Sequence, residues 1–481
     1  MRGYVTDTPY PDTFFKELSP AWLNYVAAVN GLAPRAIDGA FTYLELGCGF
    51  GTSTVINAAA FPHASFHACD FNPTHSEGGR HYAATLGVDN ITFHDAAFDR
   101  LAGCDLPAFD FIVLHGVYSW IDAPARAAVR GLIDRWLKPG GLVYVSYNTL
   151  PGWTHELPLR RLIVELAATE AGDTGTQGEA AATTLAMLQK SDWRYFTANP
   201  AAVDAVSAYG RGEGEYLAHE FMNAAWEPFY SVDVADDFAG IGLSLVGSAT
   251  LVDNHLPLVL DAKATSTIAT LATERQRQLA IDFARNQRFR RDVFTRAGQP
   301  DPDAIRSIPI GCASDTDDIG SSVRVPRGEV RFGDEFIRDV RRQVAQGSWR
   351  VGDLVAALAG HDQPEGRPLP ADQDAPAIAR NLLFLVAGGL LVPFAKAQRA
   401  QASTPTGLAS PTIAAAFRDA VARDVRRPVP SAIYGNGVMV EPSEARALLD
   451  WSQSNEARGS AARSFPSERR LKVLARLGLV A

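Results

Sequence analysis

The sequence predicts an α/β fold in which a mostly parallel sheet is covered by helices on both faces. Three features in the first third of the 481-residue chain support this. Strongly apolar segments of strand length alternate with stretches of helical periodicity. A loop with glycines at alternate positions follows the first of these segments. Aspartates, Asp70 and Asp95, close the next two. Parallel strands end at one edge of a sheet, so a ligand site is expected there.

The expected elements follow one another regularly. A helix over residues 12–30 comes first, with apolar side chains on roughly one side. Strands are expected at 41–46, 65–69, 91–93, 109–114 and 142–147, and a helix at 123–137 ends at Lys138-Pro139-Gly140-Gly141.

The glycine loop carries the strongest functional signal. Gly47, Gly49 and Gly51 allow a tight turn and a close approach of the backbone to a ligand. The helix expected from Thr52 onward directs its first amides toward that ligand. Dinucleotide-binding loops have a third glycine at the position of Thr52, so a hydride-transfer Rossmann enzyme fits less well.

Three acidic residues accompany the loop. Asp70 stands where an acid accepts both hydroxyls of a ribose in nucleotide-binding folds, and the alternative is a solvated turn residue. Asp95 is expected to accept an adenine amino group, and the alternative is a helix-capping aspartate. Glu45 is expected to hold the loop, or an amino group of the ligand, through a charge-assisted hydrogen bond.

These motifs, together with Leu137-Lys138-Pro139-Gly140-Gly141-Leu142, resemble those of class I S-adenosylmethionine methyltransferases in order and spacing. The resemblance implies a Rossmann-like core with a mostly parallel seven-stranded sheet, and S-adenosyl-L-methionine as the cofactor. The candidate cofactor-binding residues are Tyr10, Glu45, Gly47, Gly49, Gly51, Asp70, Phe71, Asn72, Asp95, Ala96 and His115.

The segment after the fourth strand bears on the methyl acceptor. Many amino-methylating relatives have a polar residue, two prolines and an aromatic residue here. His115 and Tyr118 match the polar and aromatic positions, whereas Gly116 and Val117 replace the prolines. Aromatic side chains can orient an amine and favour its neutral form, and the alternative is that they pack between the sheet and a cap. The candidate catalytic residues are Tyr118, Trp120, Tyr147 and Asn148, with Trp153 nearby.

A narrower resemblance covers at least residues 4–300. It rests on Tyr4 with Pro9-Tyr10-Pro11 and on segments 147–153, 216–221, 226–230 and 285–292. They look like a bacterial family with a "methyltransferase regulatory" domain. This family includes protein-lysine methyltransferases of surface proteins, built from catalytic, dimerisation, middle and C-terminal domains. The resemblance implies in-line N-methylation of protein lysines, with a homodimer expected. The alternatives are a small-molecule N- or O-methyltransferase and a cofactor-binding regulatory protein without turnover.

The expected domain organisation follows from changes in composition. The last helix of the predicted helical cap, residues 154–228, carries His219 and Glu220. These residues are expected either to orient an ammonium group or to form a structural pair. The arginine-rich segment 274–296 is expected to be a packing helix or subunit interface rather than a nucleic-acid face, with some arginines paired to Asp282 and Asp292. The expected parts are 1–153, the methyltransferase core; 154–228, a helical cap or dimerisation insertion; 229–262, a return to the core sheet; 263–330, the arginine-rich helix and a linker; 331–400, a winged-helix-like domain; and 401–481, a C-terminal helical region.

Composition and charge limit the partners, metals and cellular location that can be expected. A net charge of −9 argues against nucleic acid or anionic lipid as a partner. The four cysteines have no metal-ligand spacing, so no metal is expected. The N-terminus has no apolar signal core. The longest apolar run, Leu382–Ala395, is shorter than the roughly 20 residues that span a bilayer. We therefore expect a reduced, soluble, cytoplasmic protein.

Overall fold

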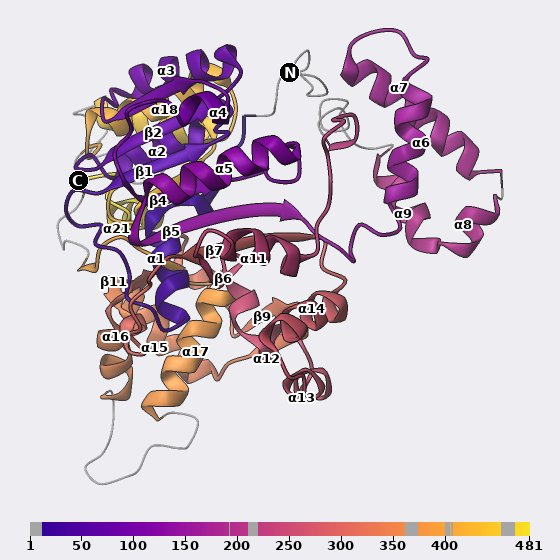
Figure 1. The fold of residues 1–481 in the computed structure, drawn as a ribbon. Helices are drawn as coiled ribbons and strands as arrows, with labels where there is room; N and C mark the ends of the chain where they lie inside the picture. Colours follow the sequence, from indigo (N-terminus) through magenta and orange to yellow (C-terminus); the bar gives the residue numbers. More distant parts are fainter. Residues whose placement is uncertain are drawn as a thin grey trace.

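The computed structural model has a seven-stranded sheet at its centre (Figure 1). It describes residues 12–191, 193–209, 220–360, 374–399, 405, 407–453 and 467–481. The strand order is β3-β2-β1-β4-β5-β7-β6, with β7 antiparallel to both neighbours and the pairs among β1 to β5 parallel. This confirms the predicted fold class. The strands are β1 (Thr42–Leu46), β2 (Ser65–Asp70), β3 (Ile91–Asp95), β4 (Phe109–Leu114), β5 (Leu137–Asn148), β6 (Ser244–Ser248) and β7 (Phe289–Thr295).

The sheet separates two apolar cores because side chains alternate along each strand. On β1, Tyr43 belongs to one core, whereas Leu44 and Leu46 belong to the other. The first core includes residues of α1, α2 and α3, and the second includes residues of α4, α5 and α11. These helices are α1 (Pro20–Val29), α2 (Thr52–Ala60), α3 (Pro73–Leu86), α4 (Phe98–Leu101), α5 (Ala123–Trp136) and α11 (Ser231–Ala239).

Two predicted boundaries differ from the structure. The first helix begins at Pro20 rather than at residue 12, because the Ser19 hydroxyl caps it by accepting a hydrogen bond from the Ala21 amide. A short 3-10 helix, η1 (Lys16–Leu18), precedes it. The turn predicted before the fifth strand lies within β5, where Leu137 already pairs with Phe109 before the register shifts.

The arginine-rich segment requires a larger correction. Only its first half is a helix, α14 (Glu274–Arg285), which ends at Asn286 in the left-handed conformation. The second half is β7, the strand between β5 and β6. The predicted return to the sheet at 229–262 supplies β6, but the sheet also takes a strand from 263–330, which was predicted as a helix and linker only. Arg290 on β7 forms buried ion pairs with Asp282 and Asp292, which confirms the expected pairing. Between β6 and α14 lie α12 (Leu256–Val259) and α13 (Ala262–Ala269).

A helical insertion follows β5 and stands to one side of the sheet in Figure 1. It has its own apolar core, which includes Trp153, Ile163 and Phe221. The longest of its described helices begins at Thr174, where the Asp173 side chain caps it by accepting a hydrogen bond from the Thr176 amide. The helices are α6 (Leu157–Ala167), α7 (Thr174–Gln189), α8 (Arg194–Ala198) and α9 (Pro200–Tyr209).

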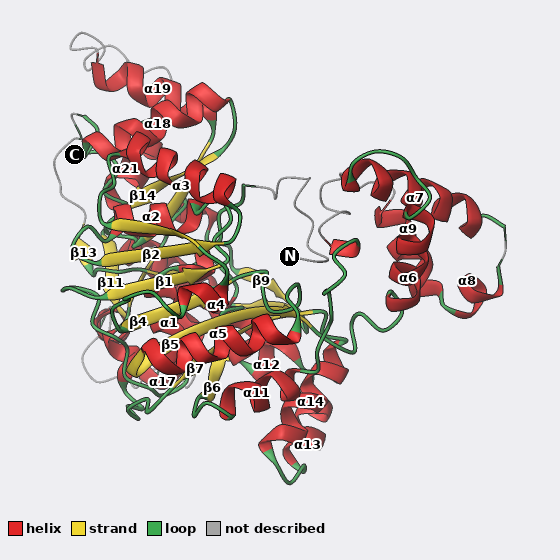
Figure 2. Ribbon diagram, turned by 45° about the horizontal axis from the view of Figure 1, so that its top comes forward, coloured by secondary structure: helices red, strands yellow, loops and turns green. Residues whose placement is uncertain are grey.

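The last third of the chain returns to the core. The linker predicted within 263–330 contains strands β8, β9 and β10, and the predicted helical region at 401–481 contains a β-hairpin, β14–β15. Figure 2 shows α18 and β14 on the same side of the sheet as α2 and α3. The elements are β8 (Pro309–Gly311), β9 (Ser322–Val325), β10 (Gly328–Arg331), α15 (Asp334–Val344), β11 (Gly347–Arg350), α16 (Val351–Ala359), α17 (Ala375–Ala387), β12 (Val392–Pro393), β13 (Gln398–Arg399), α18 (Pro411–Arg423), β14 (Arg427–Ser431), β15 (Asn436–Val440), α19 (Pro442–Gln453) and α21 (Glu468–Arg476).

Across the described ranges of the chain, we find no helix with the length and apolar character needed to cross a membrane.

Candidate functional site

The glycine loop joins β1 to α2 at the carboxyl edge of the sheet. Gly47, Gly49 and Gly51 all have positive φ, at 73°, 53° and 67°. A Cβ on Gly47 would lie 2.5 Å from Val117, and one on Gly51 would lie 2.8 Å from Phe93. A Cβ on Gly49 would meet no atom within 4 Å, so the middle of the loop borders open space. The loop therefore needs glycine for both its conformation and its packing.

Asp70 fixes the loop from the end of β2. Its Oδ2 accepts a hydrogen bond from the Gly49 amide, and its Oδ1 accepts one from the Asn72 amide, both at 2.9 Å. The ring of His75 lies 3.2 Å from the same Oδ1. Asp70 is buried, so these bonds compensate for the loss of water around its carboxyl group.

Glu45 lies on β1 beside Asp70 and is also buried. Burial, with a smaller contribution from the Asp70 charge, raises the pKa of Glu45 to about 8. Its Oε2 accepts a hydrogen bond from the Thr54 hydroxyl. A positive charge placed next to Glu45 would favour its ionised form.

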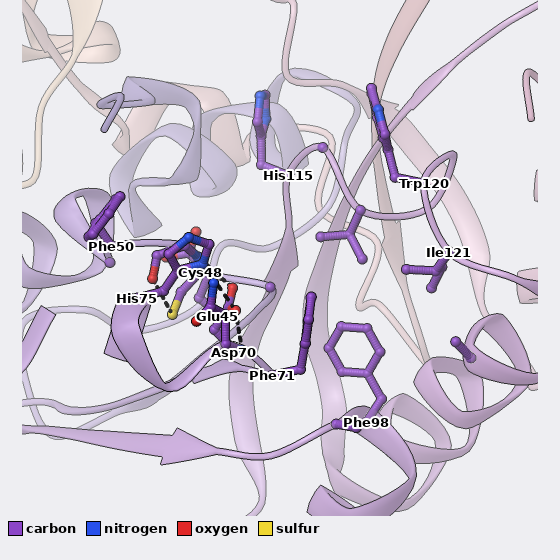
Figure 3. Close-up of a pocket in the computed structure, with 18 of the residues that line it drawn as sticks. Glu45, Cys48, Phe50, Asp70, Phe71, His75, Phe98, His115, Trp120 and Ile121 are labelled. Atoms are coloured by element: carbon purple, nitrogen blue, oxygen red, sulfur yellow. Dashed lines mark hydrogen bonds and ion pairs between the residues drawn. The ribbon is translucent and has the colours of Figure 1, made fainter. Parts of the chain in front are cut away.

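A cavity of about 530 Å³ opens over this edge. Figure 3 shows Glu45, Asp70 and His75 in one part of it, and Phe71 and Phe98 in another. The lining comes from the segment before α1, the glycine loop, the ends of β2, β3 and β4, the start of α5, and Asn223 from the helical insertion.

The charged side chains of the cavity lining are acidic. No lysine or arginine is among the lining residues that the structure describes. His115 lines the cavity and donates to or accepts from the Tyr144 hydroxyl at 2.7 Å. Burial lowers the pKa of His115 to about 3, so its ring is neutral near pH 7. The acidic lining residues are Asp12, Glu45, Asp70, Asp99 and Asp122.

Most of the candidate cofactor-binding residues come together in this cavity. Asp95 does not, because it points toward Arg80 and forms an ion pair with it at 2.9 Å. Its neighbour Ala96 does line the cavity, and Tyr10 lies outside the described residues. The candidates in the lining are Glu45, Gly47, Gly49, Gly51, Asp70, Phe71, Asn72, Ala96 and His115.

Among the candidate catalytic residues, Trp120 lines the cavity and three others do not. The Tyr118 hydroxyl donates to Asp237 at 2.6 Å, and the Tyr147 hydroxyl donates to Asp292 at 2.5 Å. The Asn148 side chain donates to the buried Glu220 at 2.9 Å. These side chains are buried away from the cavity because each is held by a polar partner from a distant segment.

The structure also gives the positions of Glu220 and Trp153 in the helical insertion. Glu220 is absent from the lining, although burial raises its pKa to about 7. Trp153 packs in the core of the insertion, with the Arg288 guanidinium 3.8 Å from its ring centre. His219 lies outside the described residues.

Several lining residues belong to no recognisable sequence motif. Asp12 and Phe15 precede the first helix, and the Phe15 ring lies 3.7 Å from that of His115. Asn223 comes from a segment that follows β5 by many residues. Its backbone oxygen accepts from Arg160 at 2.6 Å, and its side chain donates to the Trp120 backbone oxygen at 2.9 Å. Only the three-dimensional arrangement brings these residues to the cavity.

The lining fits S-adenosylmethionine. This cofactor has a sulfonium and an ammonium group, a ribose, an adenine ring and a carboxylate. The acidic part of the cavity suits the cationic groups, and Asp70, which was predicted to accept the ribose hydroxyls, is among the lining residues. The apolar part, with Phe71 and Phe98, suits a flat ring. The start of α2 presents amides to an anion. The described residues contain no group of three or more His, Cys, Asp or Glu side chains that could hold a metal.

Comparisons with known proteins agree with this geometry. Residues 44–143 match the family described as "Methyltransferase domain", and residues 213–296 match the "Predicted methyltransferase regulatory domain". The uncharacterized protein sll1526 of Synechocystis is 33% identical over 358 residues, which cover 73% of this chain and 71% of that protein. The uncharacterized protein RP789 of Rickettsia prowazekii is 25% identical over 292 residues, or 59% of this chain and 51% of that protein.

Among solved structures, PKMT2 from Rickettsia typhi has the same fold, with a TM-score of 0.72 and 16% identity. The match covers 94% of this chain and 90% of PKMT2. A second structure of PKMT2, in complex with AdoHcy, matches with the same TM-score and 17% identity, covering 95% and 92% of the two chains.

Replacing Asp70 by asparagine tests its role against that of Asp95. An amide has one acceptor oxygen, so Asp70→Asn loses at least one of the charge-assisted bonds to the loop amides. We expect the Kd for S-adenosylhomocysteine, measured by calorimetry, to rise about tenfold or more. Asp95→Asn is the matched control, because its carboxylate pairs with Arg80 outside the cavity. Equal affinities for both variants would contradict the assignment.

Proposed function

The chain belongs to the S-adenosylmethionine-dependent methyltransferases that carry a methyltransferase regulatory domain, and we propose that it methylates lysine side chains of a protein. S-adenosylmethionine is its cofactor. The charge of the cavity carries the proposal, since its lining has carboxyl groups and, within the described residues, no basic side chain other than His75 and His115. Such a site attracts a cationic acceptor such as a lysine ammonium. The similarity to PKMT2, whose name denotes a protein lysine methyltransferase, supports the same acceptor.

The acceptor amine has to lose its proton before it can react. For a lysine with a pKa of about 10.4, deprotonation at pH 7 costs roughly 4.6 kcal/mol. The side chains of Val117, Trp120 and Ile121 form an apolar part of the lining, which disfavours the charged form of an amine beside them. His115 is neutral and adds no positive charge. When bound, the cofactor supplies an electrophilic methyl group on a sulfonium sulfur, and we propose that the amine approaches it in line.

The helical insertion is proposed to shape the entry of the acceptor. Asn223 is its contribution to the lining, and it is anchored by Arg160 and by the backbone of Trp120. An anchored wall holds the acceptor in one orientation, and alignment of reacting groups can lower a barrier by roughly 7–11 kcal/mol. The insertion thereby links substrate choice to the reacting end of the cavity.

The finer organisation is part of the proposal. The insertion at 154–228 exposes Leu157, Met187 and Trp193, which suits contact with a second copy in a homodimer or with the protein substrate. Segment 331–400, with α15, α16 and α17 beside short strands, is proposed as winged-helix-like and structural. A reducing compartment such as the cytoplasm suits the four free cysteines. The acidic net charge argues against nucleic acid as a partner.

Variants at Trp120 and Tyr118 compare a residue of the cavity lining with a residue buried outside it. Trp120→Ala removes part of the acceptor wall, so we expect turnover to fall about tenfold or more while cofactor affinity changes little. Tyr118→Phe removes only the hydrogen bond that Tyr118 donates to Asp237 and the one that it accepts from Arg130, so turnover should stay within about twofold and stability should fall by about 1 kcal/mol. Steady-state kinetics and calorimetry report both quantities. Normal turnover of Trp120→Ala, or a large loss in Tyr118→Phe, would contradict these roles.

Methyl transfer from labelled S-adenosylmethionine tests the acceptor. The full chain is incubated with a lysate separated into protein and small-molecule fractions, and one protein sample has its lysines blocked beforehand. We expect label in the protein fraction, located on lysine by mass spectrometry and absent from the blocked sample. Label confined to small molecules, or on residues other than lysine, would overturn the proposed acceptor.

A further inference from the structure

The segment before α1 forms one wall of the cofactor cavity. Asp12, Thr13 and Phe15 all belong to the lining. The Phe15 amide donates to the Ser53 hydroxyl at 2.9 Å, and its ring lies against His115. This wall has no regular secondary structure from Asp12 to Phe15, so its position depends on the side-chain contacts that hold it.

Asp12 is held from two directions. One carboxylate oxygen accepts a hydrogen bond from the Thr52 hydroxyl at the start of α2. The other accepts from the Arg427 guanidinium at 2.7 Å. Arg427 is the first residue of β14 and lies 415 positions along the chain from Asp12. The wall of the cavity is therefore tied to the C-terminal part of the protein.

Arg427 is itself fixed in one place. Its side chain is only 6% exposed, and its Nε donates to Asp419 on α18 at 3.2 Å. The guanidinium lies 4.7 Å from the centre of the Tyr82 ring on α3. A guanidinium held in this way loses little further freedom when it binds Asp12, so the contact transmits position as well as charge.

The hairpin β14–β15 also packs directly behind the wall. The Asn436 side chain donates to the Lys16 backbone oxygen at 2.9 Å, and the Ser19 hydroxyl donates to the Gly435 backbone oxygen at 2.5 Å. A Cβ on Gly437 would lie 2.7 Å from the ring of Phe14. The hairpin and the wall therefore leave no room for one to shift without the other.

We propose that the C-terminal hairpin is a working part of the cofactor site, in which Arg427 is a positioning residue that holds Asp12 and the Asp12–Phe15 wall against the start of α2, directly after the glycine loop. Arg427 is not in the cavity lining and acts through Asp12. It also neutralises one of the cavity's carboxylates from outside. Cofactor affinity thus depends on a segment far from the methyltransferase domain. The inference concerns cofactor binding, which is measured without any acceptor and so stands or falls separately from the proposed lysine substrate.

Arg427→Gln tests this dependence in the full chain. We expect the Kd for S-adenosylhomocysteine, measured by calorimetry, to rise about tenfold, with a similar rise in the KM for S-adenosylmethionine and a smaller change in kcat. Arg427→Lys keeps the charge but not the fork of donors, so it should restore part of the affinity. Arg423→Gln is the matched control, since Arg423 is half-exposed and pairs with Asp419 but not with Asp12. Its Kd should equal that of the natural protein.

A double-mutant cycle with Asp12→Asn distinguishes positioning from general stabilisation. If Arg427 acts through Asp12, the losses of affinity in the two single variants should not add in the double variant. A lower melting temperature with unchanged Kd in folded Arg427→Gln would overturn the proposal. If Arg427→Gln fails to fold, Asp12→Asn decides: an unchanged Kd in that variant also overturns the proposal, and a raised Kd supports it.

Discussion

The burial of two carboxyl groups at the adjoining ends of β1 and β2 governs the organisation of the site. Charges are costly to remove from water unless they are hydrogen-bonded or paired. Asp70 is satisfied by the amides of Gly49 and Asn72, and this fixes the glycine loop. Glu45 has the Thr54 hydroxyl but no basic partner in the described cavity lining, and its pKa is raised to about 8. A cationic ligand supplies the charge that this edge of the sheet lacks, which links the fold to its cofactor.

The site is assembled from segments that are far apart in the chain. The methyltransferase domain supplies the glycine loop and the strand ends, but Asp12 and Phe15 come from before it and Asn223 from the helical insertion. Arg427 stands behind Asp12 and joins the C-terminal hairpin to the same wall. The methyltransferase domain, the helical insertion and the C-terminal part of the chain thus meet around one cavity. Substitutions far from the glycine loop are therefore expected to alter the binding of the cofactor in the cavity.

Local signals in the sequence predicted most of the fold and the cofactor end of the site. Glycines with positive φ and an aspartate at a strand end can be recognised from their immediate neighbours, so the sequence indicates Gly47, Gly51 and Asp70 as site residues, and all three line the cavity. The positions of Tyr118 and Tyr147 outside the cavity lining could not be predicted, because their hydroxyls bond to Asp237 and Asp292, which are distant in the sequence. Strand β7 was not predicted because its arginines, interleaved with apolar residues, suggested that a packing helix continues through the segment, whereas Arg290 is buried on a strand against Asp282, which precedes it, and Asp292, which follows it.

The number of protons released when S-adenosylmethionine binds tests most directly whether the acidic site takes up a cation. A pKa of about 8 leaves Glu45 mostly protonated at pH 7, and a bound sulfonium should lower that pKa and drive the proton off. Calorimetry of S-adenosylmethionine binding in buffers of different ionisation enthalpy should then show a proton released at pH 7. The release should vanish above about pH 9, where Glu45 is already ionised, and should be absent in Glu45→Gln. No release at pH 7, or the same release in Glu45→Gln, would contradict the account.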